Sequence, residues 1–419
     1  MTTRMPVAQA LHQVLGLPVR IEAYDGSTSG PTDADVRITI NSSKALSHMV
    51  SAPGELGMAR AYVSGELDIH APDHFTVLKL VAGQKIGDLT WKQRLEVLKA
   101  LGPEVIQWVE PPPQEVGAKR YLSGVRAHTK GRDAMAISHH YDVSNHFYEW
   151  VLGPSMAYTC AVYPRAEATL EEAQYEKFDL VCRKLALKPG MRLLDVGCGW
   201  GGLAIHAAKH YGVDVIAVTL SRQQAEWGQK AVAEAGLSDQ VDIRFQDYRD
   251  VPETGFDAVS SIGLTEHIGI AQLPSYAFRL ASKLAPHARL LNHCITRPDD
   301  HSKAISRRGF IGRYVFPDGE LPGVGRLVKE FQRAGLELQH EENLRLHYAK
   351  TLHAWCDNLD AHWDEAVQEV GQATARVWAT YLAGSRLGFE RNDIQLHQLL
   401  LTRTVDGVSQ FPLRPDWTA

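Results

Sequence analysis

The chain has 419 residues, of which 44% are hydrophobic and 22% charged, and its formal net charge is −5. This is the composition of an ordinary soluble globular protein, and at roughly 100–200 residues per domain the length predicts two or three folding units. The small negative charge excludes a chain that binds nucleic acid or another polyanion over its whole surface.

The cysteines and the N-terminus indicate where the protein works. Five scattered cysteines without a Cys-x-x-Cys pair argue against a disulfide framework and a structural zinc site. The first ten residues lack the apolar core of a secretory signal, and no stretch reaches the roughly 18 apolar residues of a membrane-spanning helix. We therefore expect a cytoplasmic protein that meets lipid only from its surface.

The first part of the chain predicts a small α/β domain. One segment alternates apolar and polar residues as a half-buried strand does, and two others carry apolar residues at helical spacing. The expected strand is 36–41, and the expected helices are 42–63, with a break at Pro53-Gly54, and 86–101.

The run Glu110-Pro-Pro-Pro-Gln114 is the clearest linker signal in the sequence. We therefore assign residues 1–110 to an N-terminal domain that contacts lipid or a second subunit, and residues 111–135 to a basic linker. The linker is either a solvated connection or a patch that meets anionic headgroups, where each cation contributes about 1 kcal/mol. Its cations are Lys119, Arg120, Arg126, Lys130 and Arg132.

Strands and helices alternate through the middle of the chain. This order predicts a parallel sheet with helices on both faces. The expected strands are 192–196, 213–219, 241–245, 256–261 and 288–294, and the expected helices are 169–186, 203–210, 222–235 and 276–284. The remaining segment, 300–419, is largely helical by pattern.

A glycine-rich loop, Asp195-Val-Gly197-Cys-Gly199-Trp-Gly201-Gly202, lies between an expected strand and an expected helix. Glycines let the backbone turn sharply and let a ligand approach the main chain, outside the carboxyl ends of the strands. The Gly-x-Gly-x-Gly spacing differs from the dinucleotide fingerprint, and together with Asp195 it favours an S-adenosylmethionine-dependent methyltransferase. The alternative is a tight turn without a ligand.

The next two strand ends supply further candidates for cofactor binding. The second strand ends without the acid that often holds a ribose, and Thr219 and Gln224 can form hydrogen bonds there instead. Residues 246–250, which include Tyr248 and Arg249, follow the third strand, where such folds usually hold the adenine.

Six ordered stretches resemble motifs of the cyclopropane fatty acid synthase family, which includes the mycolic-acid cyclopropane and methyl-branch synthases. The match covers roughly residues 135–400, and the first 110 residues resemble the extra domain of full-length bacterial members more loosely. The stretches are 140–148 (HYDVSNHFY), 156–161 (MAYTCA), 194–202, 218–224, 263–269 (GLTEHIG) and 311–319 (IGRYVFPDG).

The resemblance implies a Rossmann-like α/β class I methyltransferase sheet with helical acyl-binding insertions over 136–419, plus a smaller N-terminal α/β domain. It implies methyl transfer from S-adenosylmethionine to the double bond of an unsaturated acyl chain in a phospholipid, with bicarbonate as the bound base. The product is a cyclopropane or a methylene branch, and the branch is a precursor of a 10-methyl-type fatty acid.

The resemblance also assigns two sets of site residues. Those that hold bicarbonate would be Cys160, Glu266, His293 and the backbone of Ile295. Those that contact S-adenosylmethionine would be Tyr158, Thr159, Gly197, Gly199, Thr219, Gln224, Tyr248 and Arg249.

Two positions depart from the family pattern. Cys356 stands where the family has a tyrosine that completes the bicarbonate site, and Ser385 aligns with a late cysteine once treated as a nucleophile. Neither position bears on cofactor binding, but Cys356 changes the base site and hence bears on the product.

The reaction calls for an aromatic site. An alkene is a weak nucleophile and a sulfonium methyl a strong electrophile, so the enzyme must align the two and exclude water. Attack leaves a carbocation that aromatic faces stabilise, and a base then removes a proton. Proton loss from the new methyl closes a cyclopropane, whereas loss after a hydride shift, which Cys356 would favour, gives a methylene branch. The candidate aromatic residues are Tyr141, Phe147, Tyr148, Trp150, Tyr158 and Tyr314.

Other interpretations stay open at this point. Taken singly, Cys160 and Cys356 fit small buried hydrophobes, Glu266 fits a helix cap or ion pair, and His293 fits a core histidine. A methyltransferase of the same fold for a small amine or hydroxyl would not need these residues. A non-catalytic lipid-binding protein would not need the glycine loop. His139-His140 lacks a third ligand, so no metal is expected.

The expected partner is a membrane phospholipid, contacted peripherally at the inner leaflet from the cytoplasm. A homodimer and a downstream reductase that converts a methylene to a methyl branch are further expectations, and no nucleic acid is expected.

Overall fold

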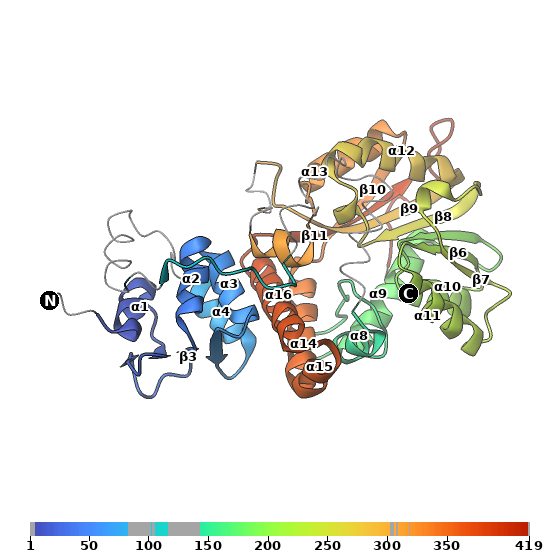
Figure 1. Ribbon diagram of the computed structural model, residues 1–419. Coiled ribbons are helices and arrows are strands. Elements are labelled where there is room, and N and C mark those ends of the chain that lie inside the picture. Colours follow the sequence, from blue (N-terminus) through green and yellow to red (C-terminus); the bar gives the residue numbers. More distant parts are fainter. Residues whose placement is uncertain are drawn as a thin grey trace. The chain divides into compact units, whose positions relative to one another are not determined.

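The computed structural model describes residues 5–82, 102, 105–115, 143–301, 306, 309–317 and 319–417 (Figure 1). The chain divides into two compact units. The first comprises Met1–Ser123, Ser306–Pro317 and Cys356–Leu387, and the second comprises Gly124–Ile305, Asp318–Trp355 and Gly388–Ala419. The helix expected over 86–101 and the cations of the linker lie outside the described residues, and the domain bounds at 110 and 135 stay predictions.

The first unit contains, among its described residues, a sheet of β1 (Arg20–Ala23), β2 (Thr28–Ser29), β3 (Arg37–Ile40) and β4 (Leu67–His70) in the order β2-β1-β3-β4. β1 pairs in parallel with β3, and the two outer pairings are antiparallel. The strand expected over 36–41 is confirmed by β3, in which Ile38 and Ile40 are buried while Arg37 is exposed.

Helices pack against this sheet. The helical stretch expected over 42–63 is confirmed, and it breaks at Gly54, whose φ of +96° suits glycine. Ala45, Leu46 and Tyr62 from these helices pack in one core with Ile21 and Ile40 of the sheet. The helices are α1 (Val7–Leu15), α2 (Ser43–Ser51), α3 (Glu55–Val63) and α4 (His74–Ala82).

Later segments also belong to the first unit: η5 (Ile311–Val315), the end of α14 (Arg345–Ala361) from Cys356 onward, α15 (Trp363–Val370) and most of α16 (Gln372–Glu390). The buried Arg376 of α16 donates from Nη1 to the backbone carbonyl of Tyr62 over 2.6 Å, and its other nitrogen pairs with Asp68 of β4. This guanidinium fixes a helix from late in the sequence to the N-terminal sheet.

The second unit is built on a sheet of seven described strands in the order β10-β11-β9-β8-β5-β6-β7. The strands from β9 to β7 run parallel, whereas β11 is antiparallel to both β9 and β10. The strands are β5 (Arg192–Val196), β6 (Asp214–Thr219), β7 (Val241–Phe245), β8 (Phe256–Ile262), β9 (Leu284–Thr296), β10 (Glu337–Asn343) and β11 (Gln395–Thr402).

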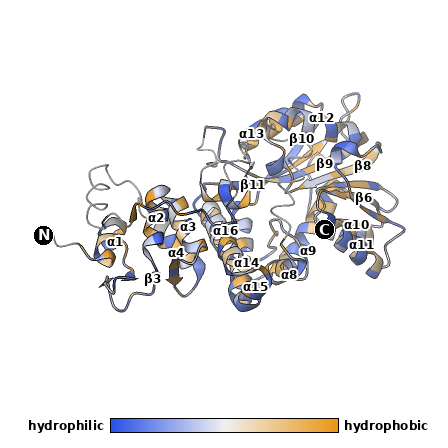
Figure 2. Cartoon of the chain, in the orientation of Figure 1, coloured by the Kyte–Doolittle hydropathy of each residue, from blue (hydrophilic) through white to orange (hydrophobic). Residues whose placement is uncertain are grey.

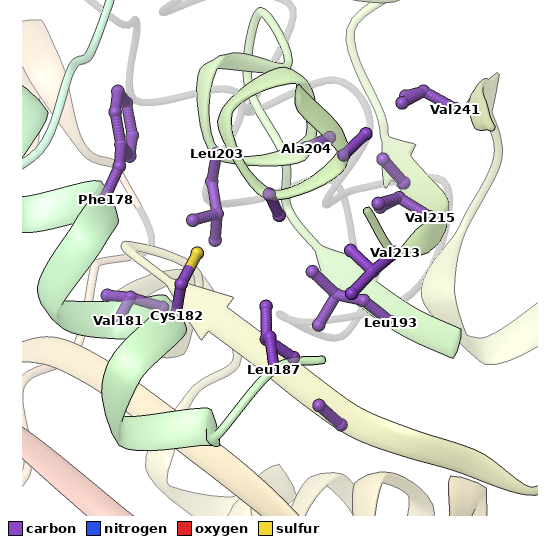
Figure 3. Packing of buried hydrophobic residues seen from close by; sticks show 14 of the residues in the cluster. Phe178, Val181, Cys182, Leu187, Leu193, Leu203, Ala204, Val213, Val215 and Val241 are labelled. Carbon is purple, nitrogen blue, oxygen red and sulfur yellow. The ribbon is translucent and has the colours of Figure 1, made fainter. Parts of the chain in front are cut away.

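Helices cover both faces of this sheet, and its inner strands are therefore largely apolar on both sides. Consecutive residues Leu193 and Leu194 fall in two different core clusters, one on each face. Figure 3 shows part of the first cluster, with Val181 and Leu203 from helices beside Leu193 of the sheet. The helices that contribute to the two clusters are α9 (Leu170–Leu185), α10 (Gly202–Tyr211), α11 (Arg222–Glu234), α12 (Leu273–Lys283) and α13 (Val324–Arg333). The unit also contains α8 (Asn145–Leu152) and the part of α14 that precedes Cys356.

The helices and strands expected between 169 and 294 are confirmed, to within a few residues at their ends. The start of α9 is fixed by its sequence, because the N-cap residue Thr169 and Glu172 form a reciprocal capping box. The helices carry both hydrophobic and hydrophilic residues (Figure 2), as is typical of helices with one face against a core. No helix within the described ranges is long and apolar enough to cross a bilayer.

The prediction for 300–419 was wrong in part, because two strands, β10 and β11, interrupt the helices there. The two strands extend the sheet beyond β9, so the sheet is mixed rather than parallel throughout. Their sequences, ELQHEEN and QLHQLLLT, carry polar residues where a buried strand is expected to be apolar. β10 tolerates them as an edge strand, and in β11 they are buried with hydrogen-bond partners.

Candidate active site

The glycine-rich loop joins the end of β5 to the start of α10, as predicted. The backbone N–H groups of Gly197 and Cys198 donate to the carbonyl of Val218 over 2.9 and 3.0 Å, which fixes the loop to the end of β6. Gly201 has a φ of +85°, and a Cβ atom there would lie 2.5 Å from Cδ1 of Ile243. Both the turn and the packing therefore require glycine at this position.

A cavity with about 950 Å³ of space, part of it open to solvent, lies at the carboxyl ends of β5, β6 and β8. Ligands of open α/β sheets bind at this edge, beside the glycine loop. The expected cofactor residues that line the cavity are Tyr158, Thr159, Asp195, Gly197, Gly199, Thr219, Gln224 and Tyr248.

Two other expected cofactor residues do not line this cavity. Gly201 serves the close packing of the loop against Ile243. Arg249 forms a bidentate pair with Asp247, with Nε–Oδ1 and Nη2–Oδ2 distances of 2.8 and 2.6 Å. Their assignment as cofactor contacts stays a prediction.

Asp195 is a buried carboxyl at the floor of the cavity. Its Oδ1 accepts a hydrogen bond of 2.7 Å from the Ser260 hydroxyl of β8. Burial raises the pKa of Asp195 to about 6, and the Ser260 hydrogen bond and the Lys177 charge counteract part of that rise. Asp195 is therefore charged at neutral pH and presents a fixed anion to the ligand.

Thr219 and Gln224 contact one another at the cavity wall. The Thr219 hydroxyl donates to Gln224 Oε1 over 2.8 Å, and the Ser221 side chain accepts from the Gln224 backbone N–H at the start of α11. Because the amide oxygen of Gln224 is already an acceptor, its NH2 group is the end that can bind a sugar hydroxyl. This arrangement replaces the missing acid with a neutral pair.

Two buried polar residues of α9 were not predicted as site residues. Lys177 lines the cavity and donates from Nζ to Thr159 Oγ1 over 2.9 Å, and Gln174 donates to the Thr159 carbonyl over 3.0 Å. Burial lowers the pKa of Lys177 to about 7. Both residues stand on the stripe of α9 that also carries Ala173 and Phe178, and polar residues on an apolar stripe are the signal that would have found them.

Glu266 lies on η3 (Thr265–His267), after β8, and faces the end of β9. The backbone N–H of Ile295 donates to its Oε1 over 2.8 Å. Burial raises the pKa of Glu266 to about 7. Its second oxygen, Oε2, is buried and has no hydrogen-bond partner among the described residues.

His293 and Cys160 are both buried in the same unit. His293 Nδ1 lies 3.1 Å from the amide nitrogen of Gln398, while its Nε2 is buried without a partner among the described residues. Burial lowers the pKa of His293 and raises that of the Cys160 thiol, so both are neutral. The Cys160 Sγ lies 3.1 Å from the carbonyl oxygen of Ala161.

Aromatic rings surround the tyrosine that lines the cavity. The ring centroid of Tyr148 lies 5.8 Å from that of Tyr158 and 4.8 Å from that of Trp200, and Tyr158 is 5.4 Å from Trp355. Tyr158 and Trp200 line the cavity themselves. The ring faces of such an aromatic cluster can stabilise a cation.

The comparisons with known proteins decide the family. The family model described as mycolic acid cyclopropane synthetase matches residues 128–399. The chain belongs to this mycolic acid cyclopropane synthetase family.

Two relatives and one solved structure illustrate the range of this family. The chain is 54% identical to a probable fatty acid methyltransferase of Mycobacterium tuberculosis over 96% of this chain and 95% of the relative. It is 35% identical to the cyclopropane-fatty-acyl-phospholipid synthase of Escherichia coli K12, over 66% of this chain and 70% of that one. The crystal structure of a mycolic acid cyclopropane synthase complexed with SAH and CTAB matches with a TM-score of 0.61 and 30% identity, over 64% of this chain and 98% of that one.

This cyclopropane synthetase family member is therefore an S-adenosylmethionine-dependent methyltransferase with a class I fold. The glycine loop and the cavity beside it lie at the edge of the sheet where open α/β folds bind their ligands. The buried carboxyl and imidazole of Glu266 and His293 can bind a small polar ligand, and the aromatic cluster can stabilise a cation.

Not every predicted catalytic residue lies in the unit that holds this cavity. Tyr141 lies outside the described residues. Cys356, Tyr314 and Ser385 belong to the first unit. Burial raises the pKa of the Cys356 thiol to about 12, so that it is neutral. The roles of these residues in the reaction of this synthetase stay predictions.

Proposed function

We propose that this enzyme transfers a methyl group from S-adenosylmethionine to the double bond of an unsaturated acyl chain in a phospholipid. The observation that carries the proposal concerns two of the buried polar atoms that lack a hydrogen-bond partner among the described residues, Oε2 of Glu266 and Nε2 of His293. Their segments are joined through the hydrogen bond between the Glu266 carboxyl and the backbone of Ile295, which lies on the same strand end as His293. Buried polar atoms are normally hydrogen-bonded, so two such atoms from neighbouring segments indicate a bound polar ligand.

The residues fit bicarbonate as that ligand. His293 is neutral, so its ring carries one N–H donor. The pKa of Glu266 is raised to about 7, so a protonated carboxyl is available near neutral pH to donate to an anion. When bound, bicarbonate supplies the base that accepts the proton released after methyl transfer.

The protein's own residues then have separate tasks. The loop from Gly197 to Gly199 receives the cofactor at the edge of the sheet, and Lys177 holds Thr159 against it. The rings of Tyr158 and Trp200 stabilise the cation that forms on the acyl chain. A neutral His293 and an aromatic wall suit a cation, because neither adds positive charge beside it.

A fatty acyl substrate is supported by the relatives. A relative that matches nearly the whole chain is named a probable fatty acid methyltransferase, and the Escherichia coli synthase is named for fatty acyl groups in phospholipids. The solved structure contains CTAB, a detergent with a long alkyl chain. We assign this chain the phospholipid substrate, since the acyl chain is then presented at a membrane surface.

We further propose that the product is a methylene-branched acyl chain, which a separate reductase would convert to a methyl branch. The family's tyrosine is replaced by Cys356, which follows directly on Trp355, a ring partner of Tyr158. We expect the shorter thiol, a weaker hydrogen-bond donor than a tyrosine hydroxyl, to hold the base less firmly and so to favour proton loss after a hydride shift. A Cys356→Tyr variant should shift the product toward cyclopropane, and an unchanged product ratio would count against this role.

The proposed function is tested by lipid mass analysis. The chain is expressed in a bacterium without its own cyclopropane synthase and supplied with an oleoyl phospholipid, and the acyl chains are then fragmented. We expect a gain of one CH2, with a methylene signature. The variants Glu266→Gln and His293→Gln should lose this gain while S-adenosylmethionine binding is retained. If the parent chain adds no CH2 group to the acyl chains, the proposed substrate is wrong and a small amine or hydroxyl becomes the favoured methyl acceptor.

Peripheral contact with the inner leaflet of the membrane is part of the proposal. Trp108 is 80% exposed and Ile106 is 65% exposed, and both precede the proline run. An exposed tryptophan prefers the headgroup region of a bilayer, where the linker cations would meet anionic lipids. The expected homodimer stays a prediction.

A further inference from the structure

Three buried polar side chains from three different elements form a continuous chain of contacts behind the base site. They are Lys184 near the end of α9, Gln398 in the middle of β11 and His293 near the end of β9. Their exposed fractions are 0%, 1% and 1%. Such a network is costly to bury unless every member is paired, so its geometry is informative.

The orientation of the Gln398 amide follows from its first neighbour. Lys184 Nζ lies 2.7 Å from Gln398 Oε1. A lysine ammonium has only donors, so the oxygen of the amide must face it and the NH2 group must point away. On the other side of the amide, the nitrogen Nε2 lies 3.1 Å from His293 Nδ1.

The orientation of the amide in turn fixes the proton on the imidazole. Because the Gln398 NH2 group donates, His293 Nδ1 must accept. A neutral ring with an accepting Nδ1 carries its proton on Nε2. That Nε2 is the atom that is buried without a partner among the described residues.

The charge of Lys184 is maintained by acids on β10. Lys184 Nζ forms an ion pair with Glu342, and Glu341 adds a weaker attraction. Burial lowers the pKa of Lys184, and these two carboxylates act against that shift. His340 also faces this region, and burial together with the Lys184 charge lowers its pKa, so it does not add a second cation at neutral pH.

We propose that Lys184 and Gln398 are positioning residues that hold His293 as the Nε2–H tautomer, so that its ring donates a hydrogen bond to the anion in the base site. This inference rests on the proposed function for the identity of the anion, but the tautomer itself does not depend on it. Residues in this outer position typically change activity by about 10–100-fold when they are removed.

The experiment uses the full chain with 15N-labelled histidine side chains and NMR detection of the protonated ring nitrogen. His293 is assigned by comparison with His293→Gln. We expect the parent protein to carry the proton on Nε2 and not on Nδ1. In Gln398→Glu the new carboxylate keeps the contact with Lys184 but cannot donate to the ring, so a proton should appear on Nδ1. A parent ring protonated on Nδ1 would overturn the proposal whatever the substrate.

The activity of the same variants supplies the second readout. For Gln398→Glu and Lys184→Met we expect kcat for acyl methylation to fall about 10–100-fold, with the Kd of S-adenosylmethionine unchanged. Gln339→Glu on β10 is the matched control, since Gln339 donates to Thr402 Oγ1 over 2.8 Å and does not contact His293. An unchanged kcat in Gln398→Glu would overturn the positioning role. Absence of acyl methylation in the parent chain would overturn the proposed function and leave the NMR result standing.

Discussion

The backbone N–H of Ile295 and the Oε1 atom of Glu266 are 2.8 Å apart, and this hydrogen bond joins the loop after β8 to the end of β9. It occupies one oxygen of the carboxyl and leaves the other buried without a partner among the described residues. The carboxyl is thus fixed in place by the backbone while half of its hydrogen-bonding capacity is kept for a ligand. This hydrogen bond therefore sets the orientation of the Glu266 carboxyl in the site.

The burial of Glu266 makes folding stability depend on pH. Burial raises the pKa of Glu266 from 4.5 to about 7 in the folded protein. The protonated carboxyl therefore costs no folding stability below pH 4.5, and this contribution to stability is lost as the pH rises through 7 and the buried group ionises. Glu266→Gln removes this dependence and should gain stability over the parent as pH rises, by about 3 kcal/mol at most. Urea unfolding of both proteins at pH 5 and pH 8 measures the difference. Equal differences at the two pH values would contradict the assignment, and the exposed Glu234→Gln serves as control.

Replacement of Lys177 by methionine should weaken cofactor binding. The Thr159 hydroxyl at the cavity wall would lose its donor over 2.9 Å, while the volume of the side chain is nearly kept. A lost hydrogen bond of this kind corresponds to about a tenfold rise in Kd. Calorimetric titration with S-adenosylhomocysteine measures the change. Lys230→Met, on the exposed face of α11, should leave the Kd as it is; a Kd that is also unchanged in Lys177→Met would show that Thr159 needs no support from α9.

The close packing of the glycine loop predicts a compensating pair of substitutions. Gly201→Ala places a Cβ 2.5 Å from Ile243 Cδ1 at a φ of +85°, and should cost about 1–3 kcal/mol of stability. Ile243→Val deletes the clashing methyl, so the double variant should regain part of that loss. Urea unfolding of the four proteins gives the coupling energy. Strictly additive effects would mean that the backbone angle alone requires glycine here.

Membrane binding should depend on the exposed tryptophan of the first unit. Trp108→Ser removes an 80% exposed ring and should weaken binding to vesicles of anionic phospholipid by about tenfold. Co-sedimentation with the vesicles measures the bound fraction. Phe278, 68% exposed on α12, provides the matched control as Phe278→Ser. Equal losses in both variants would point to a general effect of surface hydrophobicity.

Sequence patterns predicted the parts of the fold that obey simple periodicity. The strands β5, β6, β8 and β9 read as apolar runs, whereas the outer strand β7 alternates buried and exposed residues. The glycine loop lies between the strand and the helix that predicted it. Asp195 and Thr219 could be found because they stand at strand ends, and Gln224 because it lies in the first turn of the helix that follows one. The family resemblance, rather than any periodicity, supplied Glu266 and His293.

The residues near the site that could not be predicted from the sequence are polar and buried. β11 was missed because Gln398 and His397 interrupt its apolar run, and with β11 the contact between Gln398 and His293 was missed as well. Lys177 and Lys184 looked like ordinary charged residues of an amphipathic helix. Their burial depends on partners far away in the sequence, such as Glu342, and no local pattern encodes such a pairing.

The strand order has a consequence for the moment at which the enzyme becomes active. β11 inserts between β9 and β10, yet it follows both of them in the chain. During synthesis the cofactor loop and β9 can therefore leave the ribosome and begin to fold before Gln398 exists. A nascent chain can therefore complete the glycine loop before it can orient His293, so the proposed reaction has to wait until the last strand of the sheet has been made.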